Sequence, residues 1–267
     1  MINVVRSGSG PPLLLVHGLG GSLRSWDPIA PALAEARELV AIDLPGHGGS
    51  PAEPDSGTFA GLVRSVEEWL DKEKLTDVDA VGSSMGARLV LELARKGMLG
   101  DVVALNPGGF WQGWERTWVK VTLGASVRLL RGISPALPAL SRMAAARTAL
   151  LAQLSARPWA LPPALVDREL RSFAATPTFD PLLDDLAWGP LQEGPAHPAA
   201  GRLTIGWGRH DRLCLPVQAQ RAAAAFPTAS LCWYEKSGHF PMWDEPGATV
   251  ATILAGTGQA VGGVNGR

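Results

Sequence analysis

The chain has 267 residues, of which 46% are hydrophobic and 18% charged, and its net charge at pH 7 is −1. This length and balance exclude a largely disordered protein and suit one large α/β domain that carries an insertion. The near-neutral charge gives no bias toward nucleic acid. The N-terminal residues lack the features of a signal peptide and no apolar run reaches the length of a membrane span, so we expect a cytoplasmic protein with no stable membrane insertion. Cys214 and Cys232 have no metal-binding spacing and are expected to be buried thiols.

From the N-terminus onward, short apolar runs alternate with amphipathic segments, which predicts a repeat of strands and helices. Strands are expected at residues 2–5, 13–16, 39–42, 78–81, 102–105, 202–207 and 231–234. Helices are expected at residues 26–36, with Ser25 as the cap, at 58–74, directly after the turn at 82–86, at 217–226 and at 245–254. The alternation implies an α/β fold with a mostly parallel, doubly wound sheet of about seven to eight strands, covered on both faces.

The alternation of strands and helices stops at about residue 110 and resumes at about residue 199. Helix-like segments and prolines lie between these points, without a strand signal. Residues 110–198 are therefore predicted to be a helical insertion, and residues 1–109 and 199–267 the core. The natural place for an insertion after a sheet strand is over the carboxyl ends of the strands, as a cap. The Gly-rich tail that begins near residue 256 is expected to be disordered.

The segment with the clearest chemistry is Gly-Ser-Ser-Met-Gly at residues 82–86, between a predicted strand and a predicted helix. A serine at such a turn projects its hydroxyl from the top of the sheet, and the glycines allow the strand and the helix to pass closely. This pattern, a nucleophile elbow, makes Ser84 the candidate nucleophile. The alternative is an ordinary tight turn with a helix-capping serine.

A serine hydroxyl becomes a good nucleophile only beside a base and a group that orients the base. Asp211 and His239 each follow the end of a predicted strand. The chain order Ser84, Asp211, His239 therefore supplies a nucleophile, an acid and a base at neighbouring strand ends. His210, which adjoins Asp211, is the rival base, but neighbours in sequence rarely face each other in the required way.

An oxyanion intermediate needs two N–H donors. We expect one from the main chain of Met85, at the start of a helix, and the other from Leu19, in the Gly-rich loop after the strand 13–16. The alternative role of this loop, a phosphate cradle, is disfavoured because the loop lacks both GxGxxG and the P-loop lysine. His17 is expected to hold the loop by hydrogen bonds, and His47 is also expected to be structural. No pair of histidines has metal-ligand spacing, so no metal is expected.

Together these motifs make the chain similar to the α/β-hydrolase superfamily. The matching segments are HGLGG at 17–21, DLPGHGGS at 43–50, GSSMG at 82–86, WGRHD at 207–211 and SGHFPMWDEP at 237–246. The resemblance covers both flanks of the insertion but not the insertion itself. It implies a triad of Ser84, Asp211 and His239 and an oxyanion hole from Leu19 and Met85. The chain resembles cofactor-free serine esterases and the C–C hydrolases that cleave ring-fission diketones, and some members of the fold bind ligands without catalysis.

Substrate contacts are expected from Gly18, Phe110, Trp111, Trp114 and Phe240. The insertion also contains Trp118, Trp159 and Trp188, and its aromatic rings either wall an apolar pocket or pack the cap onto the core. Residues 116–157 contain seven basic residues and no acidic one. This segment is either a solvated helix face or a surface that attracts an anionic substrate or a membrane.

These features predict a serine hydrolase that cleaves a carboxylic ester of apolar or medium size through an acyl-enzyme. Its partner would be a small-molecule ester, with no cofactor and no nucleic acid. The alternatives are a C–C hydrolase that uses the same residues and a non-catalytic ligand-binding protein. The sequence leaves the oligomeric state open, including a homodimer.

Overall fold

The computed structural model describes residues 1–194 and 201–258 of the chain. Seven strands form one sheet in the order β1-β3-β2-β4-β5-β6-β7. Their bounds are β1 Asn3–Gly8, β2 Pro12–Val16, β3 Glu38–Asp43, β4 Val78–Ser83, β5 Leu99–Leu105, β6 Leu203–Gly208 and β7 Ser230–Tyr234. β1 runs antiparallel to β3, and the other neighbouring strands are parallel. The mostly parallel α/β sheet expected from the sequence is therefore confirmed.

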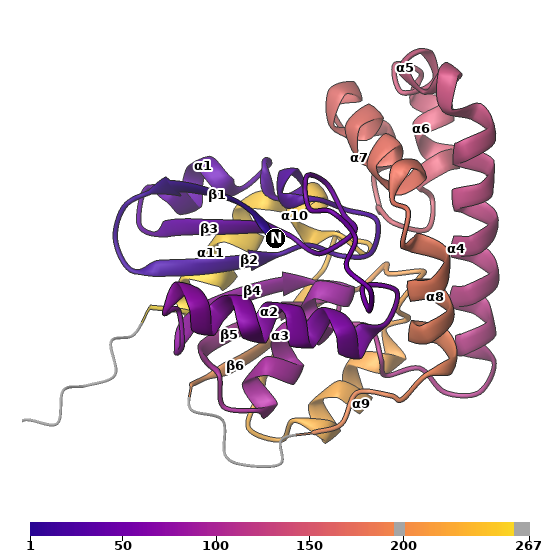
Figure 1. Cartoon of the computed structure of the whole chain (residues 1–267). Helices are drawn as coiled ribbons and strands as arrows, with labels where there is room; N and C mark the ends of the chain where they lie inside the picture. Colours follow the sequence, from indigo (N-terminus) through magenta and orange to yellow (C-terminus); the bar gives the residue numbers. More distant parts are fainter. Residues whose placement is uncertain (195–200, 259–267) are drawn as a thin grey trace, which may run out of the picture.

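Helices cover both faces of this sheet (Figure 1). Those outside the insertion are α1 Ala30–Ala34, α2 Phe59–Glu73, α3 Met85–Arg95, α9 Val217–Ala225, α10 Pro241–Asp244 and α11 Pro246–Gly256. α2 and α3 pack together on one face, and α1 contacts α11 on the other. The strands β2, β4 and β5 are almost completely buried between these layers, which explains their continuous apolar sequences.

The segment before β3 differs from the expected helix. Where the sequence predicts one helix over 26–36 with Ser25 as its cap, a 3-10 helix at Leu23–Trp26 with Ser22 as its cap precedes the short α1. Pro31 would lie in the interior of the expected helix. A proline has no N–H to donate there, and its ring collides with the carbonyl four residues earlier, so the helix instead begins beside it, with Pro31 as the second residue of α1.

Within the described residues 110–194 the chain forms helices and no strand. We call α4 to α8 the cap helices; their bounds are α4 Trp114–Ile133, α5 Leu137–Leu140, α6 Ala144–Leu151, α7 Pro163–Ala175 and α8 Phe179–Trp188. They stand together to one side of the sheet (Figure 1), where α4 packs against α7 and α8. The predicted end of the insertion at residue 198 and most of the tail predicted to be disordered lie outside the described residues. Among the described helices, none has the length and apolarity that a membrane span requires.

Candidate active site

The turn between β4 and α3 holds Ser84 in a strained backbone conformation. Its φ is +57°, in the left-handed region that residues with a side chain seldom adopt. A Cβ at Gly82 would lie 2.2 Å from the carbonyl oxygen of Gly86, and a Cβ at Gly86 would lie 2.3 Å from that of His17. Because only glycine fits at both positions, the sequence pattern itself determines the turn that presents the Ser84 hydroxyl.

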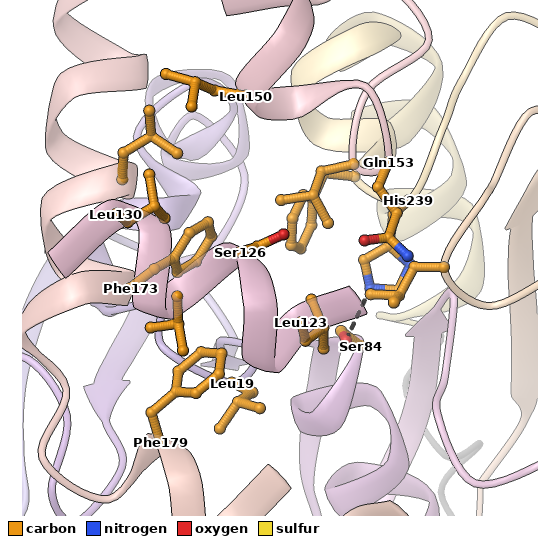
Figure 2. Close-up of a pocket in the computed structure, with 15 residues that line it drawn as sticks. Leu19, Ser84, Leu123, Ser126, Leu130, Leu150, Gln153, Phe173, Phe179 and His239 are labelled. Atoms are coloured by element: carbon orange, nitrogen blue, oxygen red, sulfur yellow. Dashed lines mark hydrogen bonds between the residues drawn. The ribbon is translucent and has the colours of Figure 1, made fainter. Parts of the chain in front are cut away.

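The side chains of Ser84, His239 and Asp211 form a continuous chain of hydrogen bonds. Nε2 of His239 lies 2.8 Å from Oγ of Ser84 (Figure 2), and Nδ1 of His239 lies 2.8 Å from Oδ2 of Asp211. The imidazole and the carboxylate are buried, whereas Ser84 is half-buried. The carboxylate of Asp211 can only accept a hydrogen bond, so Nδ1 of His239 must be the donor and carries a proton. In the neutral form of the ring this leaves Nε2 without a proton, so Nε2 can take the proton of Ser84. His210, the rival base, is exposed.

Four hydrogen bonds hold the Asp211 carboxylate. Oδ1 accepts the main-chain N–H groups of Leu213 (2.8 Å) and Cys214 (2.9 Å). Oδ2 accepts Nδ2 of Asn106 (2.6 Å) in addition to the imidazole of His239. Asn106 directly follows β5, is fully buried and has a φ of +49°, a conformation that asparagine tolerates better than most residues. Asn106 is not among the site residues expected from the sequence. Its position directly after β5, the strand beside β4, could have indicated a side chain close to the turn at Ser84.

The two expected oxyanion donors adjoin Ser84. Met85 is the first residue of α3, and Leu19 belongs to the loop after β2. Among the described groups, neither main-chain N–H has a hydrogen-bond acceptor. The loop lies directly against the serine, because a Cβ at Gly18 would be 3.0 Å from Cβ of Ser84. Unpaired N–H groups beside a nucleophile are what an oxyanion hole requires.

His17 fixes the loop that contains Leu19. Its Nε2 accepts the main-chain N–H of Leu44 (3.0 Å), so its Nδ1 carries the proton and donates to the carbonyl of Gly18 (2.7 Å). Burial lowers the pKa of His17. Burial and the neighbouring His17 ring also lower the pKa of His47, to about 3. Both rings are therefore neutral near pH 7, which fits the structural role expected for them.

An apolar cavity of about 580 Å³ adjoins Ser84 and His239. It lies between the elbow and the inner sides of the cap helices (Figure 2). Much of its wall consists of Leu123, Leu130, Leu150, Phe173, Phe179 and Phe240. Ser126 and Gln153 contribute the polar groups besides Ser84 and His239, and no described Lys or Arg lines it. The cavity therefore suits an uncharged, mainly apolar group.

A second cavity of about 370 Å³ also reaches Ser84. Trp111 lines this smaller cavity, as Phe240 lines the larger one. Phe110 lines neither, because its ring is buried edge-on against Phe226 with the ring centroids 6.4 Å apart. The substrate contact expected from Phe110 is therefore absent from both cavities beside Ser84.

Trp114, for which the sequence predicts a substrate contact, lines neither cavity beside Ser84. The exposed tryptophans of the cap are Trp114, Trp118, Trp159 and Trp188, at 64%, 39%, 52% and 55%. None of the four lines these cavities, and Trp118 contacts the core through a hydrogen bond from its Nε1 to the carbonyl of Arg212. The cause lies in α4, where Glu115 is buried in an ion pair with Arg221 of α9 (2.5 Å) and Val119 packs on the same side. This contact turns Trp114 toward solvent.

One described group of side chains could offer several ligands to a metal ion. Asp211, Cys214 and His239 place three ligand atoms within 4.8 Å of one another. The imidazole and the carboxylate are already bonded to each other, to Ser84 and to Asn106. Burial and the nearby Asp211 raise the pKa of the Cys214 thiol well above its ordinary value, which disfavours the thiolate that a metal would need. These residues therefore fit a hydrogen-bonded triad better than a metal centre.

The chain that follows α6 is tied to the histidine loop. The carbonyl of Leu154 accepts the main-chain N–H groups of His239 (2.9 Å) and Phe240 (3.3 Å). Asp244 of α10 accepts Oγ of Ser155 (2.5 Å), and its other carboxylate oxygen accepts the N–H of Ala156 (2.8 Å). The same short segment thus anchors the cap and supports the backbone of the imidazole.

Comparison with known proteins agrees with this architecture. The family model for the alpha/beta hydrolase family matches residues 13–253. An uncharacterized protein of Mycobacterium tuberculosis (strain ATCC 25618 / H37Rv) is 28% identical over 277 residues, which cover 90% of this chain and 73% of the relative. A thermophilic esterase from Thermogutta terrifontis has a similar structure, with a TM-score of 0.75, 18% identity, and 95% of this chain and 92% of that chain covered. A meta-cleavage product hydrolase from Pseudomonas fluorescens IP01 has a TM-score of 0.72 and 16% identity, with 95% and 93% covered. The two structures share the fold, and the family model spans most of the sequence, so this chain belongs to the alpha/beta hydrolase family.

Proposed function

We propose that this protein is a serine hydrolase that cleaves a carboxylic ester with an uncharged, apolar acyl group of medium size. The observation that carries the proposal is the hydrogen-bonded chain from Asp211 through His239 to Ser84, at one side of an apolar cavity of about 580 Å³. We also propose that residues 110–194 act as a cap that shapes this site, over a core formed by the described residues 1–109 and 201–258.

In the proposed reaction, Oγ of Ser84 attacks the ester carbonyl while Nε2 of His239 takes its proton. Asp211 keeps the imidazole in the required tautomer and stabilises its positive charge. The N–H groups of Leu19 and Met85 donate to the oxyanion, and losing one such donor typically costs on the order of 100- to 1,000-fold in rate. The imidazolium then protonates the leaving alcohol, and water activated by His239 hydrolyses the acyl-enzyme.

The alternative reaction is C–C bond hydrolysis of a ring-fission diketone by the same residues. Such substrates carry a carboxylate, and an enclosed carboxylate needs a cationic partner. The larger cavity has no Lys or Arg among its described lining residues. The smaller cavity has Arg88, whose guanidinium lies over the Phe59 ring and donates to the carbonyl of Pro190. The apolar wall of the larger cavity therefore favours the ester, and a comparison of kcat/KM on nitrophenyl esters and on a carboxylate-bearing diketone separates the two reactions.

The test measures hydrolysis of nitrophenyl esters of increasing acyl length by the wild type and by Ser84→Ala. We expect the wild type to prefer medium-length acyl groups. The kcat of the variant should be lower than that of the wild type by more than about 10⁴-fold. A fluorophosphonate should label the wild type on Ser84, as located by mass spectrometry. Ligand binding without turnover of any ester would instead favour the non-catalytic alternative, and full activity of Ser84→Ala would exclude the mechanism.

A further inference from the structure

The outer side of α4 carries a row of exposed apolar side chains, which we call the tryptophan face: Trp114, Trp118, Val121 and Leu129. They are exposed at 64%, 39%, 59% and 53%, respectively. Their spacing places them on one side of the helix. The rings of Trp114 and Trp118 meet edge to face with centroids 6.3 Å apart, and Nε1 of Trp118 donates to the carbonyl of Arg212 (2.9 Å). The rings are thus held in place although they face water.

Among the described residues, the packing of α4 leaves this face largely uncovered, apart from the contact of Trp118 with Arg212. Its opposite side lines the larger cavity through Leu123, Val127 and Leu130. In Figure 1, α4 forms the outer boundary of the cap helices, on the side away from β1. Isolated exposed apolar residues are common on proteins, but a row along one long helix, including two tryptophans, marks a contact surface.

The charges around the tryptophan face are positive. Arg128 lies on the same side of α4, and Arg212 lies beside Trp118; both are exposed, and within the described part of the chain neither forms an ion pair. The two exposed carboxylates of α8 that approach α4 are neutralised, since Asp180 pairs with Arg131 and Asp184 with Lys120. Of the seven basic residues in segment 116–157, Lys120 and Arg131 are the partners in these two pairs and Arg147 is buried, so the cations that accompany the tryptophan face are Arg128 and Arg212.

We propose that the tryptophan face docks this protein on the surface of an anionic lipid bilayer. Indole rings favour the boundary between headgroups and acyl chains, and cations beside them attract anionic headgroups. A second copy of this chain fits the face less well. A second copy would present the same face, which carries Arg128 and Arg212 but no carboxylate among its named residues to pair with them.

The test is sedimentation of the full-length protein with vesicles of phosphatidylcholine alone or mixed with phosphatidylglycerol. We expect binding to the anionic vesicles to be tighter by on the order of tenfold or more, and to weaken as salt is raised. Trp114→Ala/Trp118→Ala and Val121→Glu/Leu129→Glu should each weaken this binding by about tenfold or more. The second pair involves no side-chain hydrogen bond, so it tests the face even if the first pair folds poorly.

The matched control is Val5→Glu/Ser7→Glu, which adds the same two negative charges on β1, away from the tryptophan face. It should bind like the wild type. Absence of binding to anionic vesicles at low salt, or wild-type binding by either face variant, would overturn the proposal. It would also be overturned if sedimentation velocity showed a dimer that Val121→Glu/Leu129→Glu dissociates, without vesicle binding. Vesicle binding is measured without ester turnover, so failure of the proposed hydrolysis would leave this result intact.

Discussion

Replacing Asn106 with glycine removes the amide that holds Asp211 and leaves the backbone undisturbed, because glycine adopts a φ of +49° without strain. The lost hydrogen bond measures 2.6 Å and reaches Oδ2, the oxygen that also accepts Nδ1 of His239. A hydrogen bond to a charged group is worth about 1.5–3 kcal/mol. If this stabilisation is lost from the transition state, kcat/KM for ester hydrolysis falls about 10- to 100-fold, at about 1.4 kcal/mol per factor of ten.

Steady-state kinetics on a soluble nitrophenyl ester measure this effect. Asn106 contacts the acid and not the substrate, so we expect the loss in kcat with little change in KM. Asn106→Asp keeps the shape, and only its protonated form can donate the same bond, so its activity relative to the wild type should fall as pH rises. Asn3→Gly, which removes another Asn–Asp bond (2.7 Å, to Asp43), should leave kcat within about twofold of the wild type. An unchanged kcat in Asn106→Gly would refute the reasoning.

Three further substitutions test the elbow, the buried ring of His47 and the larger cavity. Gly86→Ala places a Cβ 2.3 Å from the carbonyl oxygens of Val16 and His17. We expect a loss of roughly 3 kcal/mol or more in the free energy of unfolding by urea, and wild-type stability would contradict this packing. The pKa of His47 is about 3 in the folded chain against 6.5 for a free ring, so the unfolded chain binds a proton first and stability is lost as pH falls below 6.5. Between about pH 7 and pH 5 the wild type should therefore lose about 2 kcal/mol more than His47→Gln, again by urea unfolding, and parallel losses would exclude a buried neutral ring. Leu150→Trp fills the part of the cavity that is remote from Ser84 (Figure 2), so kcat/KM should fall about tenfold or more for the longest acyl esters and stay unchanged for acetate; equal loss for both would argue against this acyl site.

The sheet and the three residues of the hydrogen-bonded chain could be predicted because short sequence segments around each of them indicate their structure. Gly82 and Gly86 mark the elbow around Ser84, since any larger side chain would collide with the backbone nearby. Asp211 and His239 each follow an apolar run, and parallel strands bring such positions to one edge of a sheet. No contact between distant residues was needed to name them.

The orientation of α4 could not be predicted in this way. The helix has two apolar rows, one through Val119 and Leu123 and the other through Trp114 and Trp118, and both follow helical spacing. The contact that decides between them joins Glu115 to Arg221, which are 106 positions apart. The break before Pro31, by contrast, was readable from the sequence, because a proline in a helix interior has no N–H for the continuing helix.

The carbonyl of Leu154 couples the position of the cap, which shapes the substrate site, to the position of the His239 imidazole. Because it accepts the N–H of His239, a rigid swing of the entire cap would drag the imidazole away from Ser84. Entry and exit of ligand by smaller movements of individual helices or side chains would leave this hydrogen bond intact. Exchanging this cap for one from a relative would alter selectivity only if the graft also reproduced the acceptor at position 154. Evolution of new substrate preferences in this chain is accordingly constrained to side-chain replacement inside a fixed frame.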